Sequence, residues 1–252
     1  MAIIMLKKRL TAVFIALSII CASLCVTIGV YRRQKREFTP RFQAPLRSEG
    51  CYFENNIFYQ SGFGIPNCTA YAWGRAYELL GEEPRLCTSD AREWFSYNKR
   101  TGAYDYGDEP RLGAIACFDN EYGGHVAVVE NIDDGVITFS NSAYMGSEFY
   151  LSTASVNDNS AGQKDWSFQG YIYLSNFDEK ELSINSNRRI SAVDGLNLRE
   201  YPSTQAEIID TIPEKSQVYI TKVVKCGEYF WGKASFGKKN GYCVIDYTEY
   251  SL

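Results

Sequence analysis

The 252-residue chain contains a single histidine, His125, and this scarcity restricts the chemistry that the protein can carry out. A histidine-rich metal site is excluded, and any reaction that pairs a cysteine with a histidine must use His125. The chain has 8 cysteines, but no two of them are spaced as Cys-x-x-Cys, so the spacing of a zinc ribbon is absent.

A strong excess of charge of either sign is also absent, since 26 Lys and Arg stand against 30 Asp and Glu. Domains that bind nucleic acids carry clustered basic surface, so this balance argues against a nucleic-acid partner. Hydrophobic residues make up 45% of the chain and aromatic residues 15%, which is enough for one or two domains with a real core. The 19 tyrosines fit either exposed aromatic surface that stacks on sugars or an ordinary β-rich composition.

One long apolar run is present, and it lies near the N-terminus. Residues 10–30 are uncharged and follow three basic residues at 7–9. Spanning a bilayer needs ~20 apolar residues, whereas a cleaved signal peptide has an apolar core of only ~7–15 residues and ends in a small-x-small site. We therefore expect residues 1–31 to form an N-terminal transmembrane helix that serves as an uncleaved anchor, with a cleaved signal peptide as the alternative.

The segment after this run, residues 32–50, is basic, carries two prolines and is predicted to be a stalk. Basic residues prefer the cytoplasmic side of a membrane, so by this rule the bulk of the chain would face inward. The function inferred below requires the opposite orientation. We expect a single-pass protein of the cell membrane with its catalytic part extracytoplasmic, and the basic segment conflicts with this expectation.

The stretch around Cys68 predicts one helix with the cysteine at its first position. Pro66 and Asn67 are start signals and Gly81 is a stop signal. Unpaired backbone N–H groups and the positive end of the helix dipole would stabilise a thiolate there, which is the nucleophilic form. The alternative is a small buried core cysteine. A second helix is expected at 89–97.

Strands are predicted after this helical part. A three-residue loop at 133–135 would join two strands into a hairpin whose register sets Asn141 opposite Ala127. Because Ala127 and His125 are two residues apart, they share a face, and Asn141 comes within side-chain reach of His125. A slip of one residue would put them on opposite faces. The expected strands cover residues 113–118, 125–130 and 136–141.

A cysteine at a helix start, a histidine at a strand start and an asparagine on the next strand can perform nucleophilic catalysis. The Cys68 thiolate attacks a carbonyl carbon, the His125 imidazole takes and returns the proton, and the Asn141 amide orients the imidazole. The backbone N–H of Cys68 would stabilise the oxyanion.

Three segments then resemble a known family. Residues 67–75, 124–130 and 140–144 look like the cysteine, histidine and third-residue motifs of CHAP domains, the cysteine, histidine-dependent amidohydrolases/peptidases. Asn141 stands where many members have glutamate. The resemblance covers about residues 51–174, and we expect the catalytic domain at 51–178. The candidates for the substrate cleft are Tyr71, Trp73 and Tyr144.

The resemblance implies an α+β, papain-like fold and hydrolysis of amide bonds in bacterial peptidoglycan, as an N-acetylmuramoyl-L-alanine amidase or a peptide-bridge endopeptidase. Some members carry an acidic calcium-binding loop before the cysteine, but residues 54–64 here hold one carboxylate, Glu54. Calcium prefers several oxygen ligands, so no metal and no other cofactor are expected. The rival interpretations are a non-catalytic wall-binding protein and a wall-opening component of a conjugation or secretion apparatus.

The last part of the chain predicts a separate all-β unit. A polar stretch at 179–189 is the expected linker, and regular short strands follow at 190–252. Residues 196–199, 231–234 and 241–244 resemble the motifs of bacterial SH3-like domains, although Tyr201 replaces the usual small residue before the proline. This resemblance implies a small barrel that binds the wall, with a simple spacer as the alternative. The oligomeric state cannot be derived from the sequence.

Overall fold

The computed structural model describes residues 36–158, 160–163, 165–178, 186–226 and 228–250. The described residues from Glu37 onward belong to one compact unit, Glu37–Leu252. The expected anchor at residues 1–31 lies outside the described residues. Within the described ranges, no helix has the length and the apolar character that crossing a membrane would require.

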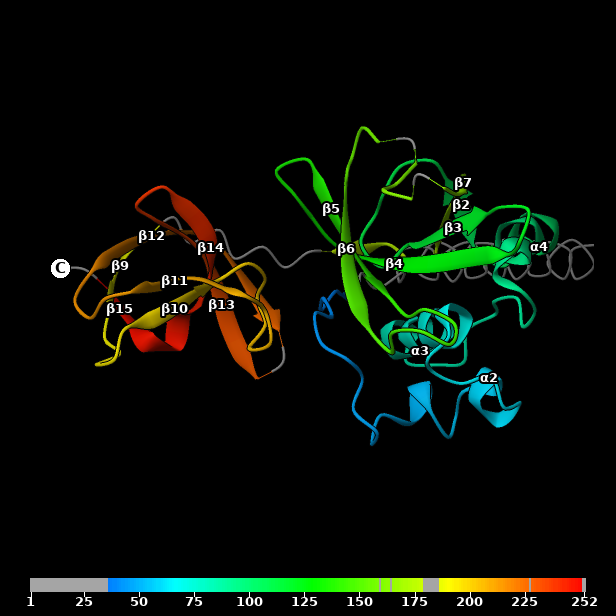
Figure 1. Cartoon of the computed structure of the whole chain (residues 1–252), viewed down its shortest axis with the longest axis horizontal. Helices are drawn as coiled ribbons and strands as arrows, with labels where there is room; N and C mark the ends of the chain where they lie inside the picture. The colour runs from blue at the N-terminus through cyan, green and yellow to red at the C-terminus, as the bar shows by residue number, and fades with distance from the viewer. Residues whose placement is uncertain (1–35, 159, 164, 179–185, 227, 251–252) are drawn as a thin grey trace, which may run out of the picture. The chain divides into compact units, whose positions relative to one another are not determined.

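The described residues are mostly β, so the expectation of an α+β fold is wrong. They form fifteen strands, most of them in one six-stranded and one seven-stranded sheet (Figure 1). The α-helices are α2 (Ile57–Gln60), α3 (Cys68–Leu80) and α4 (Trp94–Thr101), accompanied by the 3-10 helices η1 (Gly50–Tyr52), η2 (Ala91–Glu93) and η3 (Ile245–Tyr247). Among the described residues α3 is the longest helix, and the second expected helix, at 89–97, is split into η2 and the short α4.

The six-stranded sheet carries the candidate site and is antiparallel throughout, in the order β2-β7-β3-β4-β5-β6. Side chains alternate between its two faces. Val126 and Val128 belong to the cluster that includes α3, whereas Ala127 and Val129 belong to a second cluster. The strands are β2 (Asp105–Gly107), β3 (Ile115–Asp119), β4 (Gly124–Asp133), β5 (Val136–Asn141), β6 (Tyr150–Ser155) and β7 (Ser167–Tyr173).

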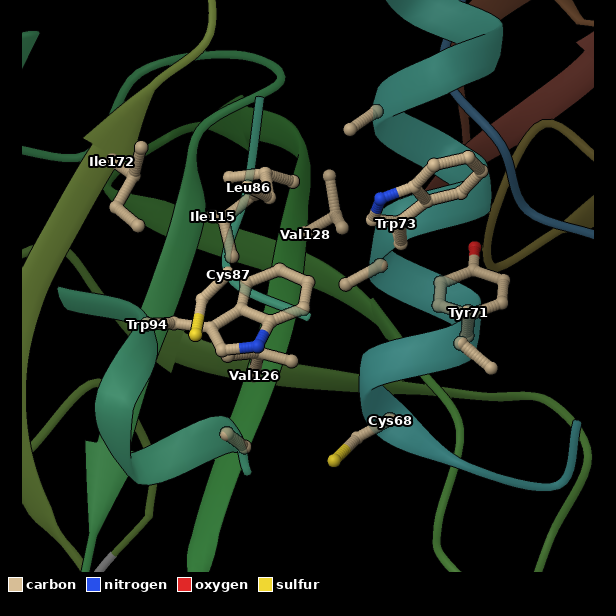
Figure 2. Close-up of a cluster of buried hydrophobic side chains, with 14 of the residues drawn as sticks. Cys68, Tyr71, Trp73, Leu86, Cys87, Trp94, Ile115, Val126, Val128 and Ile172 are labelled. Carbon is tan, nitrogen blue, oxygen red and sulfur yellow. The ribbon is translucent and has the colours of Figure 1, made fainter. Parts of the chain in front are cut away.

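The predicted helix that begins at Cys68 is confirmed. The Asn67 side chain caps α3 by accepting a hydrogen bond from the Thr69 N–H at 3.1 Å. The helix ends at Gly81, whose φ of 66° is a left-handed conformation that glycine adopts without strain. Almost every side chain from Cys68 to Ala76 is buried, so α3 is a core helix rather than a surface helix with one apolar stripe (Figure 2).

The hairpin of β4 and β5 closes more tightly than the sequence predicted. Asp133 pairs with Val136, so the turn has two residues, Asp134 and Gly135, both with positive φ. The three-residue loop is therefore wrong by one residue. A bulge between Val129 and Asn131 shifts the register back by one. Val128 consequently pairs with Ser140, which continues to the predicted pairing of Ala127 with Asn141.

Residues 38–49, which we call the strap, pack on the catalytic part of the chain, although the sequence assigned them to the stalk. Phe38 is buried, with its ring 5.6 Å from that of Phe177. The Thr39 carbonyl accepts a hydrogen bond from Arg75 at 2.6 Å, and the Arg41 N–H donates one to Glu130 at 2.8 Å. The packed body therefore begins before Cys51.

The C-terminal residues form the seven-stranded sheet, in the order β11-β10-β14-β13-β12-β9-β15. It has a core of its own that includes Ile190, Leu198, Ile220 and Cys243. Cys226 and Cys243 are both free thiols, as are all the cysteines of the described residues. The strands are β9 (Ser186–Ile190), β10 (Leu196–Arg199), β11 (Ile208–Ile212), β12 (Gln217–Cys226), β13 (Tyr229–Phe236), β14 (Lys239–Val244) and β15 (Thr248–Tyr250), and two-residue strands lie at β1 (Arg36–Glu37) and β8 (Phe177–Asp178).

Candidate active site

Cys68 is the first residue of α3, and its sulfur is turned from the helix toward the sheet (Figure 2). The backbone N–H groups of Val126, Thr69 and Cys68 itself lie close enough to the sulfur to lower the pKa of its thiol, which places the sulfur beside the start of β4. Burial raises the pKa of the Cys68 thiol above its ordinary value, and these backbone donors only partly oppose the rise. The thiolate expected from the helix start is thus disfavoured, because burial outweighs the helix N-terminus.

His125 and Asn141 lie as the sequence predicted, with His125 Nε2 and Asn141 Oδ1 3.0 Å apart. The other end of the amide, Nδ2, donates to Ser152 Oγ at 3.0 Å and to the Phe139 carbonyl at 3.3 Å. A carbonyl can only accept, so the amide must present Oδ1 to the ring, and Nε2 must carry the proton. This tautomer leaves Nδ1 of His125 unprotonated and able to act as a base.

The pKa of His125 is lowered, because burial disfavours the charged imidazolium more than the hydrogen bond to Asn141 favours it. The pKa of the Cys68 thiol is raised, so both shifts favour the neutral thiol and the neutral imidazole over a preformed ion pair.

Two aromatic rings enclose the imidazole. The Phe118 ring is 6.1 Å from that of His125, and the Trp166 ring is 6.0 Å away. Phe118 pairs directly with His125 across β3 and β4. Trp166, which is half-buried just before β7, was not predicted from the sequence. The available signal was a lone tryptophan in a polar, turn-rich segment.

Tyr71 and Trp73 cannot line a substrate cleft, because both are buried in the core around α3 at 0% and 1% exposure. The prediction failed because α3 is covered on all sides. Tyr144, by contrast, is 62% exposed. It follows Asn141 in a loop held against the start of α3, where Ser142 Oγ accepts a hydrogen bond from the Asn67 N–H at 3.0 Å.

The start of α3 also offers a donor for an oxyanion. An α-helix leaves its first four N–H groups without partners inside the helix. The Asn67 side chain takes the N–H of Thr69, and Ser142 takes that of Asn67. The N–H of Cys68 lies between these two, at the sulfur that would attack the carbonyl. It is therefore the candidate donor, as the sequence analysis expected.

No group of three or more His, Cys, Asp or Glu side chains in the described part of the chain could hold a metal ion. The expectation that the reaction needs no metal stays a prediction.

Comparison with known proteins identifies the segment that contains this geometry. Residues 58–143 match the CHAP domain family. This segment is a CHAP domain. The protein is accordingly an enzyme, an amidohydrolase or peptidase of cell-wall peptidoglycan. No curated protein matches the chain.

Solved structures show a weaker similarity to this chain. The crystal structure of Ly7917 is 17% identical with a TM-score of 0.33, and the match covers 72% of this chain and 84% of that one. Ly7917 with the hydrolyzing product of MDP is 18% identical, with a TM-score of 0.32 and the same coverage. NlpC2 from Trichomonas vaginalis is 13% identical, with a TM-score of 0.23, and the match covers 57% of this chain and 46% of that one.

Gly124 leaves no room for a side chain at the start of the histidine strand of the CHAP domain. A Cβ atom there would lie 1.9 Å from the backbone nitrogen of Arg92 in η2. We expect Gly124→Ala to displace His125 and to lower kcat about 10- to 100-fold, since a displacement of ~1 Å can cost ~10²-fold. Gly123→Ala is the matched control, because its nearest neighbouring atom lies 4.0 Å away. Equal kcat values for the two variants, measured on a soluble muropeptide, would refute this role of Gly124.

The lowered pKa of His125 predicts the acid limb of the pH profile. The base loses activity when it is protonated, so kcat/KM should fall only below the ordinary histidine pKa of 6.5. The hydrogen bond from Asn141 raises the pKa of His125. Asn141→Ala should therefore move the acid limb to still lower pH, while also lowering the plateau. A pH–rate series on both proteins tests this, and a shift of the limb to higher pH in Asn141→Ala would contradict it.

Proposed function

We propose that the CHAP domain cleaves an amide bond of bacterial peptidoglycan with Cys68 as nucleophile, His125 as base and Asn141 as the residue that orients the imidazole. The observation that carries the proposal is the hydrogen bond between His125 Nε2 and Asn141 Oδ1, with the Cys68 sulfur beside Val126, the next residue of the histidine strand. This arrangement leaves His125 Nδ1 as the ring nitrogen that can take the thiol proton.

The reaction follows from these positions. As the Cys68 sulfur attacks the amide carbon, its proton passes to His125 Nδ1, and the oxyanion accepts a hydrogen bond from the Cys68 N–H. The imidazolium then protonates the leaving nitrogen, so the C–N bond breaks and a thioester remains on the enzyme. A water molecule gives its proton to His125 and attacks the thioester, which releases a carboxylate and restores the thiol.

The exposed Tyr144 is proposed to contact substrate at the edge of this site. Its loop is held to the start of α3 through Ser142 and through the Met145 N–H, which donates to the Pro66 carbonyl at 3.3 Å. An exposed aromatic ring on a loop that is tied to the start of α3 suits stacking on a sugar.

The C-terminal sheet is proposed to be a bacterial SH3-like module that holds the enzyme at the wall. The segments that resemble that family are ordered as strands, with residues 196–199 forming β10 and residues 231–234 and 241–244 lying in β13 and β14. A module that serves only as a spacer would give the full chain no more affinity for purified wall than the catalytic part has.

Digestion of purified wall tests the function and identifies the bond. Cleavage between muramic acid and L-alanine releases free stem peptides and intact glycan strands, whereas cleavage in a peptide bridge releases stems that are still joined to sugar. Mass spectrometry of the soluble fragments separates these two products. Unchanged wall after incubation with folded protein, while a known wall hydrolase digests the same preparation, would refute the proposal.

The location of the enzyme is also a proposal. The substrate lies outside the cell and the apolar run at 10–30 suits a tether, whereas the basic residues after the run favour the opposite orientation. We expect a cysteine introduced by Gln34→Cys to react with a membrane-impermeant thiol reagent in intact cells after wall removal. Reaction only after lysis would place the chain inside the cell and exclude access to the wall.

A further inference from the structure

Glu130 accepts four hydrogen bonds that come from three separate segments of the chain. Its Oε1 accepts from Arg75 Nε at 2.9 Å and from Ser140 Oγ at 2.7 Å. Its Oε2 accepts from Arg75 Nη2 and from the Arg41 N–H, both at 2.8 Å. Glu130 is 1% exposed. A carboxylate has about four acceptor positions, so this side chain is fully occupied by the protein.

Glu130 and two of its three partner residues lie on the elements that carry Cys68, His125 and Asn141. Arg75 is on α3, about two turns after Cys68 and hence on the same side of that helix. Glu130 itself is on β4, the strand of His125.

Ser140 completes this set, because it is next to Asn141 at the end of β5. We propose that Glu130 is a positioning residue that sets the spacing of Cys68, His125 and Asn141. This inference rests on the function proposed above.

The bulge in β4 explains why such a residue is needed. Glu130 is the extra residue between Val129 and Asn131, at the point where the register shifts by one. A strand that slipped back into regular pairing would turn Asn141 to the opposite face of the sheet, away from His125. The bonds from Glu130 to Arg75 and Ser140 oppose that slip, because they fix the bulge to α3 and to β5.

Two backbone groups of the strap complete the hydrogen bonds of Glu130 and Arg75. The Arg41 N–H fills the last acceptor position of Glu130, and the Thr39 carbonyl accepts from Arg75 Nη2 at 2.6 Å. Arg75 is 1% exposed, so both charges of the pair are kept from water. In such surroundings hydrogen bonds are stronger than they are in water and hold their geometry more closely.

Ser140→Ala is the most direct test, because it cuts the link between Glu130 and β5 while leaving the buried ion pair intact. We expect kcat on a soluble muropeptide to fall about tenfold or more with KM within about twofold, since a displacement of the reacting groups by ~1 Å can cost ~10²-fold. We also expect the pH profile of Cys68 alkylation by iodoacetamide, followed by mass spectrometry of its peptide, to shift. A residue that only stabilised the fold would change neither measurement in a protein that stays folded.

Thr138→Val is the matched control, since Thr138 is buried on the same strand and is not one of the four donors to Glu130. It should leave kcat and the alkylation profile unchanged. Glu130→Gln, which keeps the shape and removes the charge, should reproduce the loss in kcat. The proposal is overturned if folded Ser140→Ala has a kcat within about twofold of that of Thr138→Val.

The two proposals fail differently. If the wild-type protein releases no muropeptide fragments, the proposed function is wrong. The pH profile of Cys68 alkylation then tests the positioning role of Glu130 without any measurement of hydrolysis. An identical profile in wild type and Ser140→Ala overturns the positioning role, and a shifted profile supports it even without a known substrate.

Discussion

Folded Cys68→Ser and His125→Ala should each lose almost all hydrolysis of purified peptidoglycan, with kcat lowered about 10⁴-fold or more. Serine at position 68 offers a hydroxyl group. The buried imidazole of His125 has a lowered basicity and cannot deprotonate this hydroxyl efficiently. His125 is the only histidine of the chain, so no other imidazole can take its place. The measurement is the release of soluble fragments, calibrated against known amounts of digested wall.

The double variant sharpens this prediction. Because nucleophile and base act as a unit, Cys68→Ser combined with His125→Ala should be barely slower than either single variant. Asn141→Ala should retain measurable turnover, because it frees the imidazole to rotate without removing it. Unchanged thermal melting establishes that each variant is folded. Near-normal hydrolysis by folded Cys68→Ser would exclude the cysteine mechanism.

Arg75→Met should unfold at much lower urea concentration than the wild type. The substitution leaves Glu130 buried without its cation, and breaking a buried pair in this way costs about 3–5 kcal/mol. Burial on its own would lower the pKa of Arg75, but the carboxylates of Glu130 and Glu78 hold that pKa well above its usual range. Arg75 thus stays charged in the interior. Equilibrium unfolding, followed by tryptophan fluorescence, measures the change in midpoint.

Two further variants show whether the charge or the packing is responsible. Arg92→Ala removes an exposed arginine whose contact with Asp90 is 3.5 Å long, and the midpoint should not move. Arg75→Met combined with Glu130→Leu replaces the pair by apolar side chains, which is often neutral for stability, and should recover most of the midpoint. If the double variant is as unstable as Arg75→Met, the loss comes from packing and not from an unpaired charge.

The site was more predictable than the fold, and the hairpin shows why. Sequence signals located the capped helix at Cys68 and the strands of His125 and Asn141, because caps and apolar alternation are local. The turn was predicted one residue too long, since Asp134 adopts a positive φ that only the closed hairpin requires. The bulge at Glu130, which the sequence did not predict, shifts the register by one residue in the opposite direction. The error in the turn length and the missed bulge therefore cancelled at Asn141.

Other features depend on contacts between distant segments and left no local signal. Trp166 reaches His125 only because β7 pairs with β3, and the burial of Tyr71 and Trp73 depends on what covers α3. The expected α+β fold failed for a related reason. The cysteine helix was recognisable, but the short elements around it turned out to be strands and single turns.

The contacts of the strap also determine at which residue a recombinant form of the enzyme should begin. A clone that begins at Cys51, where the aromatic density of the sequence rises, would omit Thr39 and Arg41. The Arg75–Glu130 pair would then face solvent with one acceptor and one donor missing. A clone that begins at Glu37 keeps both. For this protein, the shortest useful expression product is longer than the segment that family resemblance delimits.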